Sequence, residues 1–145
     1  MALLSAPDVV QLSHVISEAT APAFVLGAVA GFVSILLTRL TAIIERIRHL
    51  NEIGDEEQSR ARLKSDLPRL RRRARMLNNA TRLALASGVC TALLLVVAFG
   101  SAFLRLQHVY GAGILFFLAV ALLGAALFRF GQEVAMGLSE ADHYR

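Results

Sequence analysis

Hydrophobic and polar positions divide the chain into long uncharged stretches and one highly charged region. Residues 19–38, 83–104 and 106–128 contain no Asp, Glu, Lys or Arg. A helix of about 20 apolar residues crosses a hydrocarbon core about 30 Å thick. The pattern therefore predicts an all-α integral membrane protein with three transmembrane helices.

The first uncharged stretch passes into charged sequence without a stop signal. In "GFVSILLTRLTAIIERIRHL", residues 31–50, no proline, internal glycine or turn cluster marks the change. Residues 22–53 are predicted to form one helix about 48 Å long, which exceeds the hydrocarbon core. Gly54 is the expected C-terminal cap, and Asp55 is the expected start of a return helix.

Two apolar stripes with gaps of three and four residues flank this turn. They consist of Leu36, Leu40, Ile43, Ile47 and Leu50 before it, and Leu63, Leu67, Leu70, Ala74 and Leu77 after it. Such stripes on helices joined by a short turn are typical of antiparallel, coiled-coil-like packing. The first two spans are therefore predicted to extend into a helical hairpin, with Pro68 kinking or restarting the return helix.

The N-terminal residues predict a short amphipathic helix before the first span. Ser5 and Asp8 form a capping box, and Thr20 with Pro22 supplies a second helix start. We expect a single membrane domain over residues 1–145. Its parts are an outer amphipathic helix (5–20), a first span (21–40), a basic helical hairpin (41–82), a second span (83–104), a third span (110–130) and a tail (131–145).

Charge distribution predicts the orientation. Of the fifteen Lys and Arg residues, twelve lie in the segment from Arg39 to Arg82. The same segment contains six acidic residues. A basic loop between two spans is retained in the cytoplasm. We therefore expect the bacterial inner membrane, an outside N-terminus and a cytoplasmic C-terminus. The basic region contains no Phe, Tyr or Trp, which disfavours nucleic-acid binding.

A stripe of small and polar residues follows the first helix. This first seam comprises Gly27, Gly31, Ser34, Thr38, Thr41 and Glu45, spaced alternately by four and three residues. A second seam on the second span comprises Ala80, Ala84, Ser87, Thr91, Leu94, Ala98 and Ser101. Small residues permit close helix contact, so both seams favour helix packing. The alternative for the first seam is the lining of a pore, with Glu45 at its inner mouth.

Other charged residues lie near the ends of the spans. The run "RLRRRARM" places Arg69, Arg71, Arg72, Arg73 and Arg75 where anionic lipid headgroups are expected to bind. The remaining span-end residues are Glu18, Arg39, Arg105, Arg129 and Glu133. None is at mid-membrane depth, which disfavours a proton relay. The three arginines among them are interpreted as snorkelling anchors.

Candidate chemistry is sparse. The four histidines are isolated, and Cys90 is the single cysteine, so neither a metal site nor a disulfide is expected within one chain. The sequence contains no nucleophile elbow, phosphate loop or dinucleotide fingerprint. We expect no enzymatic activity and no cofactor.

Two segments carry a resemblance to a known family. "ISEATAPAFVLGAVAGFVSILLTRLTAIIERIRHL" and "LPRLRRRARMLNNATRLALAS" resemble a bacterial membrane family named domain of unknown function 2721 (DUF2721). The resemblance covers nearly the whole chain and implies a small protein with three spans. It implies no activity.

Two functional hypotheses follow from the seams and the span pattern. The first is a homo-oligomeric inner-membrane protein that forms a narrow ion-conducting pore. The alternative is a non-conducting accessory or scaffold subunit of a larger membrane complex. Both use the same seams as helix contacts, so the sequence leaves the choice open.

Overall fold

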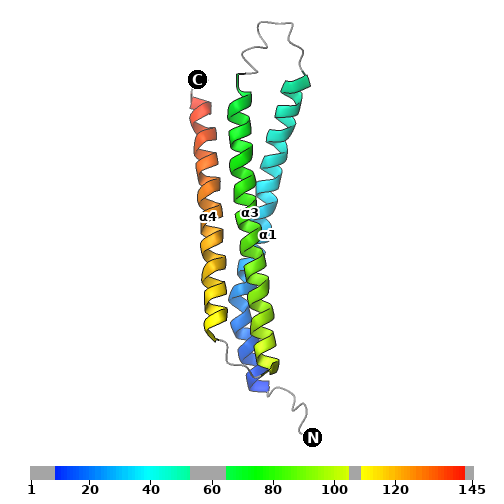
Figure 1. Cartoon of the computed structure of the whole chain (residues 1–145), viewed down its shortest axis with the longest axis vertical. Coiled ribbons are helices and arrows are strands. Elements are labelled where there is room, and N and C mark those ends of the chain that lie inside the picture. The colour runs from blue at the N-terminus through cyan, green and yellow to red at the C-terminus, as the bar shows by residue number, and fades with distance from the viewer. Residues whose placement is uncertain (1–8, 53–64, 105–108, 143–145) are drawn as a thin grey trace.

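Three long helices make up the computed structural model, which describes residues 9–52, 65–104 and 109–142 (Figure 1). They are α1 (Val9–Glu52), α3 (Leu67–Leu104) and α4 (Val109–Asp142). These ranges contain no strand. The all-α prediction is confirmed for the part of the chain that the structure describes.

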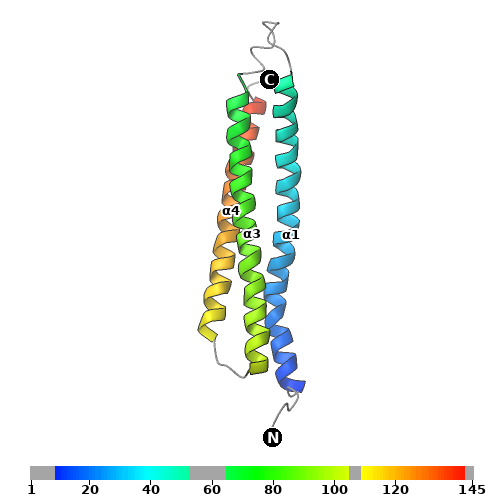
Figure 2. The same ribbon diagram turned by 45° about the vertical axis from the view of Figure 1, so that its right-hand side comes forward.

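Helix α3 lies between the other two helices. It runs antiparallel to both, so α1 and α4 point the same way (Figures 1 and 2). Both outer helices pack extensively against α3, whereas α1 and α4 touch each other over a small area. The architecture is an elongated bundle organised around α3.

All three helices have the length and apolar composition of membrane spans. The membrane-like segments are Ile16–Glu52, Leu67–Ser101 and Tyr110–Leu138. Large apolar side chains such as Phe24, Val96 and Phe117 point away from the bundle. Outward apolar side chains on helices of this length are typical of lipid-facing surfaces. The chain is therefore a multi-pass helical membrane protein.

The core follows heptad rows along the helices. In α1 the row is Val29, Leu36, Ile43 and Leu50, all buried. The α3 residues Leu70, Leu77 and Ala84 share a buried cluster with most of this row. A seven-residue repeat keeps one face of each helix against its neighbour, as in coiled coils. Nine of the ten predicted stripe residues of α1 and α3 are thus part of this cluster or pack against it. The tenth, Leu63, and the turn at residues 53–64 lie outside the described residues.

The second seam forms the interior of the bundle. Ala80, Ala84, Ser87 and Thr91 are fully buried. The Ser87 hydroxyl donates a hydrogen bond to the Ala119 carbonyl of α4 at 2.7 Å. On the other side of α3, a Cβ added to Gly88 would lie 3.3 Å from Val29 of α1. Small residues therefore let α3 approach both neighbours closely, as the sequence predicted.

The break predicted at residues 20–22 is absent, because α1 continues through Pro22. The Thr20 hydroxyl donates to the Ile16 carbonyl at 3.1 Å instead of capping a new helix. Hydroxyl side chains bond to carbonyls four residues earlier within helices, and membrane helices tolerate proline. Residues 9–20 are the first turns of α1, and Ser5 and Asp8 lie outside the described residues.

The other two boundary predictions have different outcomes. Helix α3 begins at Leu67 with Pro68 in its first turn, where proline lacks only an N–H that has no helical partner. The predicted kink or restart at Pro68 stays a prediction, because residues 53–64 before it lie outside the described residues. Helix α4 continues beyond the expected span (110–130) to Asp142, so residues 131–142 of the expected tail are helical.

Candidate functional site

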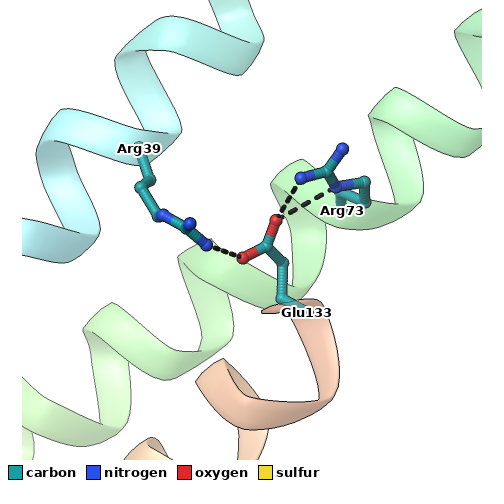
Figure 3. Close-up of polar contacts among 3 residues, drawn as sticks. All are labelled: Arg39, Arg73 and Glu133. Atoms are coloured by element: carbon teal, nitrogen blue, oxygen red, sulfur yellow. Dashed lines mark hydrogen bonds and ion pairs between the residues drawn. The ribbon is translucent and has the colours of Figure 1, made fainter. Parts of the chain in front are cut away.

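The buried carboxylate of Glu133 binds arginines from the two other helices (Figure 3). Arg73 of α3 donates from Nε and Nη2 to Oε1 of Glu133 at 3.0 and 2.7 Å. Arg39 of α1 donates from Nη1 to Oε2 at 2.9 Å. Each carboxylate oxygen of Glu133 in α4 therefore accepts from a different helix. We refer to these three residues as the Glu133 cluster.

Helix register brings Arg73 and Glu133 together. Ser87 of α3 contacts Ala119 of α4. Arg73 lies fourteen residues before Ser87, and Glu133 lies fourteen residues after Ala119. Two heptads along antiparallel helices return both residues to the same facing positions. The row that contributes buried Ala80 and Ser87 to the core thus ends in Arg73, and its partner row ends in Glu133.

Arg39 reaches the cluster along the side where α1 and α4 meet. Its guanidinium carbon lies 5.4 Å from the centroid of the Phe130 ring. Phe130 also packs edge-to-face against Phe32 of α1, with the ring centroids 5.5 Å apart. A cation over an aromatic face is attracted by the ring's electron density. Phe130 and Glu133 therefore hold the Arg39 guanidinium from two directions.

The carboxylate is deeply buried, whereas its partners are not. The Glu133 side chain is 0% exposed, compared with 22% for Arg73 and 45% for Arg39. A buried charge is tolerated only when it is paired and hydrogen-bonded. Within the described residues, every buried side-chain nitrogen or oxygen has a partner. The cluster is thus a satisfied ionic contact in a bundle whose other buried polar side chains, among the described residues, are the hydroxyls of Thr81, Ser87 and Thr91.

The cluster lies just outside the uncharged spans. Val29 of α1, Gly88 of α3 and Ala119 of α4 lie at about the same level, because Gly88 adjoins Val29 and the neighbouring Ser87 binds Ala119. From this level towards the Glu133 cluster, Arg39 lies about 15 Å along α1, Arg82 about 9 Å along α3 and Arg129 about 15 Å along α4. The three helices therefore become charged at similar depth. The Cα atoms of Arg73 and Glu133 lie roughly 6 Å further out on the same scale. This depth corresponds to the headgroup region of a bilayer.

The first seam faces away from the bundle. All six of its residues are exposed, and a Cβ added to Gly27 or Gly31 would meet nothing within 4 Å. Each of the six lies within about 40° of the point opposite Leu36, the fully buried residue of α1. The Thr38 hydroxyl donates to the Ser34 carbonyl within the helix at 2.9 Å. The first seam therefore contributes no contact between the three helices.

The basic run divides into two groups. Arg69, Arg71, Arg72 and Arg75 are exposed, and they remain candidates for lipid contact. Arg73 instead points into the bundle and binds Glu133. A Cβ added to Gly137 of α4 would lie 2.9 Å from Arg73 Nη2, so a glycine at this position leaves room for the guanidinium.

The Glu133 cluster is not among the sites expected from the sequence. There, Arg39 is expected to be a snorkelling anchor and Arg73 to belong to the lipid-binding run. The missed signal is the heptad row Ala112, Ala119, Ala126 and Glu133, in which a carboxylate continues a row of small apolar residues. A charge in a core row predicts a partner on the facing helix.

Histidines and carboxylates are dispersed over the described residues. Their closest pair is His14 with Glu18, 3.3 Å apart on the exposed surface of α1. No group of three potential metal ligands occurs in residues 9–52, 65–104 and 109–142. Cys90 is half-buried and has a free thiol.

Three membrane-length helices fastened by a buried ionic cluster place the chain among small multi-pass helical membrane proteins. Residues 19–142 match the family described as "Protein of unknown function (DUF2721)", and the chain belongs to this family. The expected resemblance is thereby confirmed. No curated protein matches the chain, and no solved structure matches it.

Proposed function

We propose that this protein is a homo-oligomeric inner-membrane protein whose copies meet through the first seam. The observation that carries the proposal is the outward position of this seam. Helix α1 places the small and hydroxyl residues of the first seam on its exposed face, opposite the buried Val29, Leu36 and Ile43. In lipid, such small-residue faces allow the close backbone approach that drives helix association.

A second copy is the partner that fits the seam best. Glu45 ends the seam, and Arg48 follows on the same face of α1; both are exposed. In a contact between parallel copies of α1, Glu45 of one copy would lie one turn from Arg48 of the next. The surface therefore carries both charges that a symmetric interface requires.

We further propose that the seam borders a narrow ion-conducting pore at the oligomer axis. Ser34, Thr38 and Thr41 would present hydroxyls along the path, and Glu45 would form a ring at its inner mouth. Carboxylate rings of this kind select cations. Inside the single bundle, Ser87 and Thr91 are buried and donate to backbone carbonyls, so the proposed path runs between subunits.

The alternative function is a non-conducting scaffold or accessory subunit. The Glu133 cluster favours it, because a fully satisfied buried ion pair holds the three helices in one arrangement. A fixed bundle with an exposed small-residue face can also bind the helices of a larger complex. This function would use the same seam without conduction.

The remaining parts of the proposal come from the sequence pattern. We place the N-terminus outside the cell and the ends of α1 and α4 that carry Glu52 and Asp142 in the cytoplasm. The exposed arginines at 69, 71, 72 and 75 would then contact anionic headgroups of the inner leaflet. We assign the protein no enzymatic activity, cofactor or nucleic-acid partner.

Native mass spectrometry of the purified protein tests the assembly. We expect masses at whole multiples of this chain, whereas co-purifying foreign subunits would favour the scaffold. Ion flux into liposomes then tests conduction. We expect cation flux that Thr38→Val reduces; an assembled protein without flux under any applied gradient would contradict the pore.

A further inference from the structure

We infer that Arg39 binds the phosphate of an anionic phospholipid in the leaflet next to the Glu133 cluster. This site differs from the exposed arginines at 69, 71, 72 and 75, because its guanidinium is held by Glu133 and Phe130. The inference does not depend on oligomerisation. Its basis is the geometry, depth and exposure of one side chain.

Arg39 has hydrogen-bonding capacity beyond its contact with Glu133. Among the described residues, it donates one hydrogen bond from Nη1 and packs against the Phe130 ring. A guanidinium carries five N–H donors in a planar fork. Because the side chain is 45% exposed, the donors that do not face Glu133 are open to the surroundings.

The surroundings at this depth are lipid headgroups. Arg39 is the first charged residue after the uncharged stretch 19–38 of α1. It lies within about 6 Å of Arg82 and Arg129 along the bundle axis, where all three helices leave the hydrocarbon core. The anion available in greatest amount at this boundary is the phosphate of a lipid.

Fixation of the guanidinium makes Arg39 a better ligand than a mobile surface arginine. Glu133 holds one end, and Phe130 covers one face. An arginine whose fork is already oriented loses less conformational freedom when it binds phosphate. Arg46 offers the comparison, because it lies one heptad further along α1, is exposed, and forms none of the ion pairs found in the described residues.

The test uses the full-length protein in detergent, with bound lipid measured by native mass spectrometry. Phosphatidylglycerol is the anionic probe and phosphatidylcholine is the neutral one. We expect Arg39→Gln to weaken phosphatidylglycerol binding about fivefold, the effect of one arginine at a membrane surface. Arg46→Gln should change it much less. Equal losses in both variants, or no loss in Arg39→Gln, would overturn the inference.

A second variant covers the case in which Arg39→Gln does not fold. Arg39→Lys keeps the charge and can pair with Glu133, but a single ammonium group has no fork to share with a phosphate. We expect normal helicity by circular dichroism together with weakened phosphatidylglycerol binding. Full binding would show that charge alone suffices and would contradict a fixed site.

Inorganic phosphate tests whether the site at Arg39 binds a small soluble phosphate instead of a lipid headgroup. We expect the protein to retain phosphatidylglycerol in the presence of inorganic phosphate. Displacement of the lipid by inorganic phosphate, with the same dependence on Arg39, would assign the site to a small soluble anion and overturn the lipid assignment.

Discussion

Arg73 donates two hydrogen bonds, from Nε and Nη2, to a single oxygen of Glu133, sixty positions further along the chain. These hydrogen bonds connect α3 to α4 where the facing heptad rows of Ser87 and Ala119 end. It also leaves the second oxygen of Glu133 for Arg39 of the first helix. One buried carboxylate therefore contacts all three helices.

Removal of that carboxylate should destabilise the bundle. Glu133→Ala leaves two guanidiniums around a buried position without their counter-ion, so we expect a loss of about 3 kcal/mol in the free energy of unfolding. The estimate is at the low end for buried pairs, because Arg39 is half exposed. Denaturant unfolding in detergent measures it. Glu45→Ala is the control, because Glu45 is exposed and should change stability little; equal effects would contradict the role of Glu133.

Substitution of Gly137 should lower the stability of the fold, because this glycine lies directly against the Arg73 guanidinium. The new Cβ in Gly137→Ala would lie 2.9 Å from Nη2, an atom that Glu133 holds in place. Displacement of the guanidinium weakens a charged hydrogen bond, for which we expect a loss of roughly 1 to 2 kcal/mol. Thermal unfolding measures it.

Two comparisons identify the cause of that loss. Gly131 has open space around its position, so Gly131→Ala should be neutral or slightly stabilising, as alanine usually is in a helix. In an Arg73→Gln background, the penalty of Gly137→Ala should disappear. A penalty that persists without Arg73 would show that the glycine is needed for another reason.

Much of the fold was predictable from periodicity. Uncharged length predicted three spans. The alternating gaps of three and four residues predicted which side chains of the first two helices lie in the core, and Leu36 and Leu77 are indeed fully buried. The second seam was predictable for the same reason. The start signal at Thr20 and Pro22 was misleading, because a local cap competes with the continuation of a long helix.

The Glu133 cluster was harder to predict because its three members come from three helices. Recognition of the heptad row ending in Glu133 requires the register of α4 against α3, which Ser87 and Ala119 fix in the structure. The sequence also did not predict whether the first seam faces into the bundle or away from it. Gly27 and Gly31 have a spacing that suits contact with α3 or with another molecule, and only the packing of Leu36 places them outside.

The proposed orientation in the membrane rests on the twelve basic residues between the first two spans. Single cysteines at Ser13 and Asn51, two exposed residues near opposite ends of α1, report on it in a Cys90→Ala background. In intact cells, an impermeant thiol reagent should label position 13 and leave position 51 unlabelled. Labelling at position 51 alone would reverse the proposed topology.

Assembly through the first seam is the central claim, and the oligomer mass of Gly31→Leu tests it most directly. Gly31 has nothing within 4 Å of an added Cβ, so the single bundle accommodates leucine. A neighbouring copy packed closely against the seam would not. Ala28→Leu is the matched control, since Ala28 is exposed at similar depth and lies about 100° from the centre of the seam.

Size-exclusion chromatography with light scattering gives the protein mass of each variant in detergent, and circular dichroism checks its helicity. We predict that Gly31→Leu retains its helical content but has a smaller oligomer mass, whereas Ala28→Leu assembles like the unmodified protein. A folded Gly31→Leu protein with the full oligomer mass would contradict the account, because it would remove the first seam from the subunit interface.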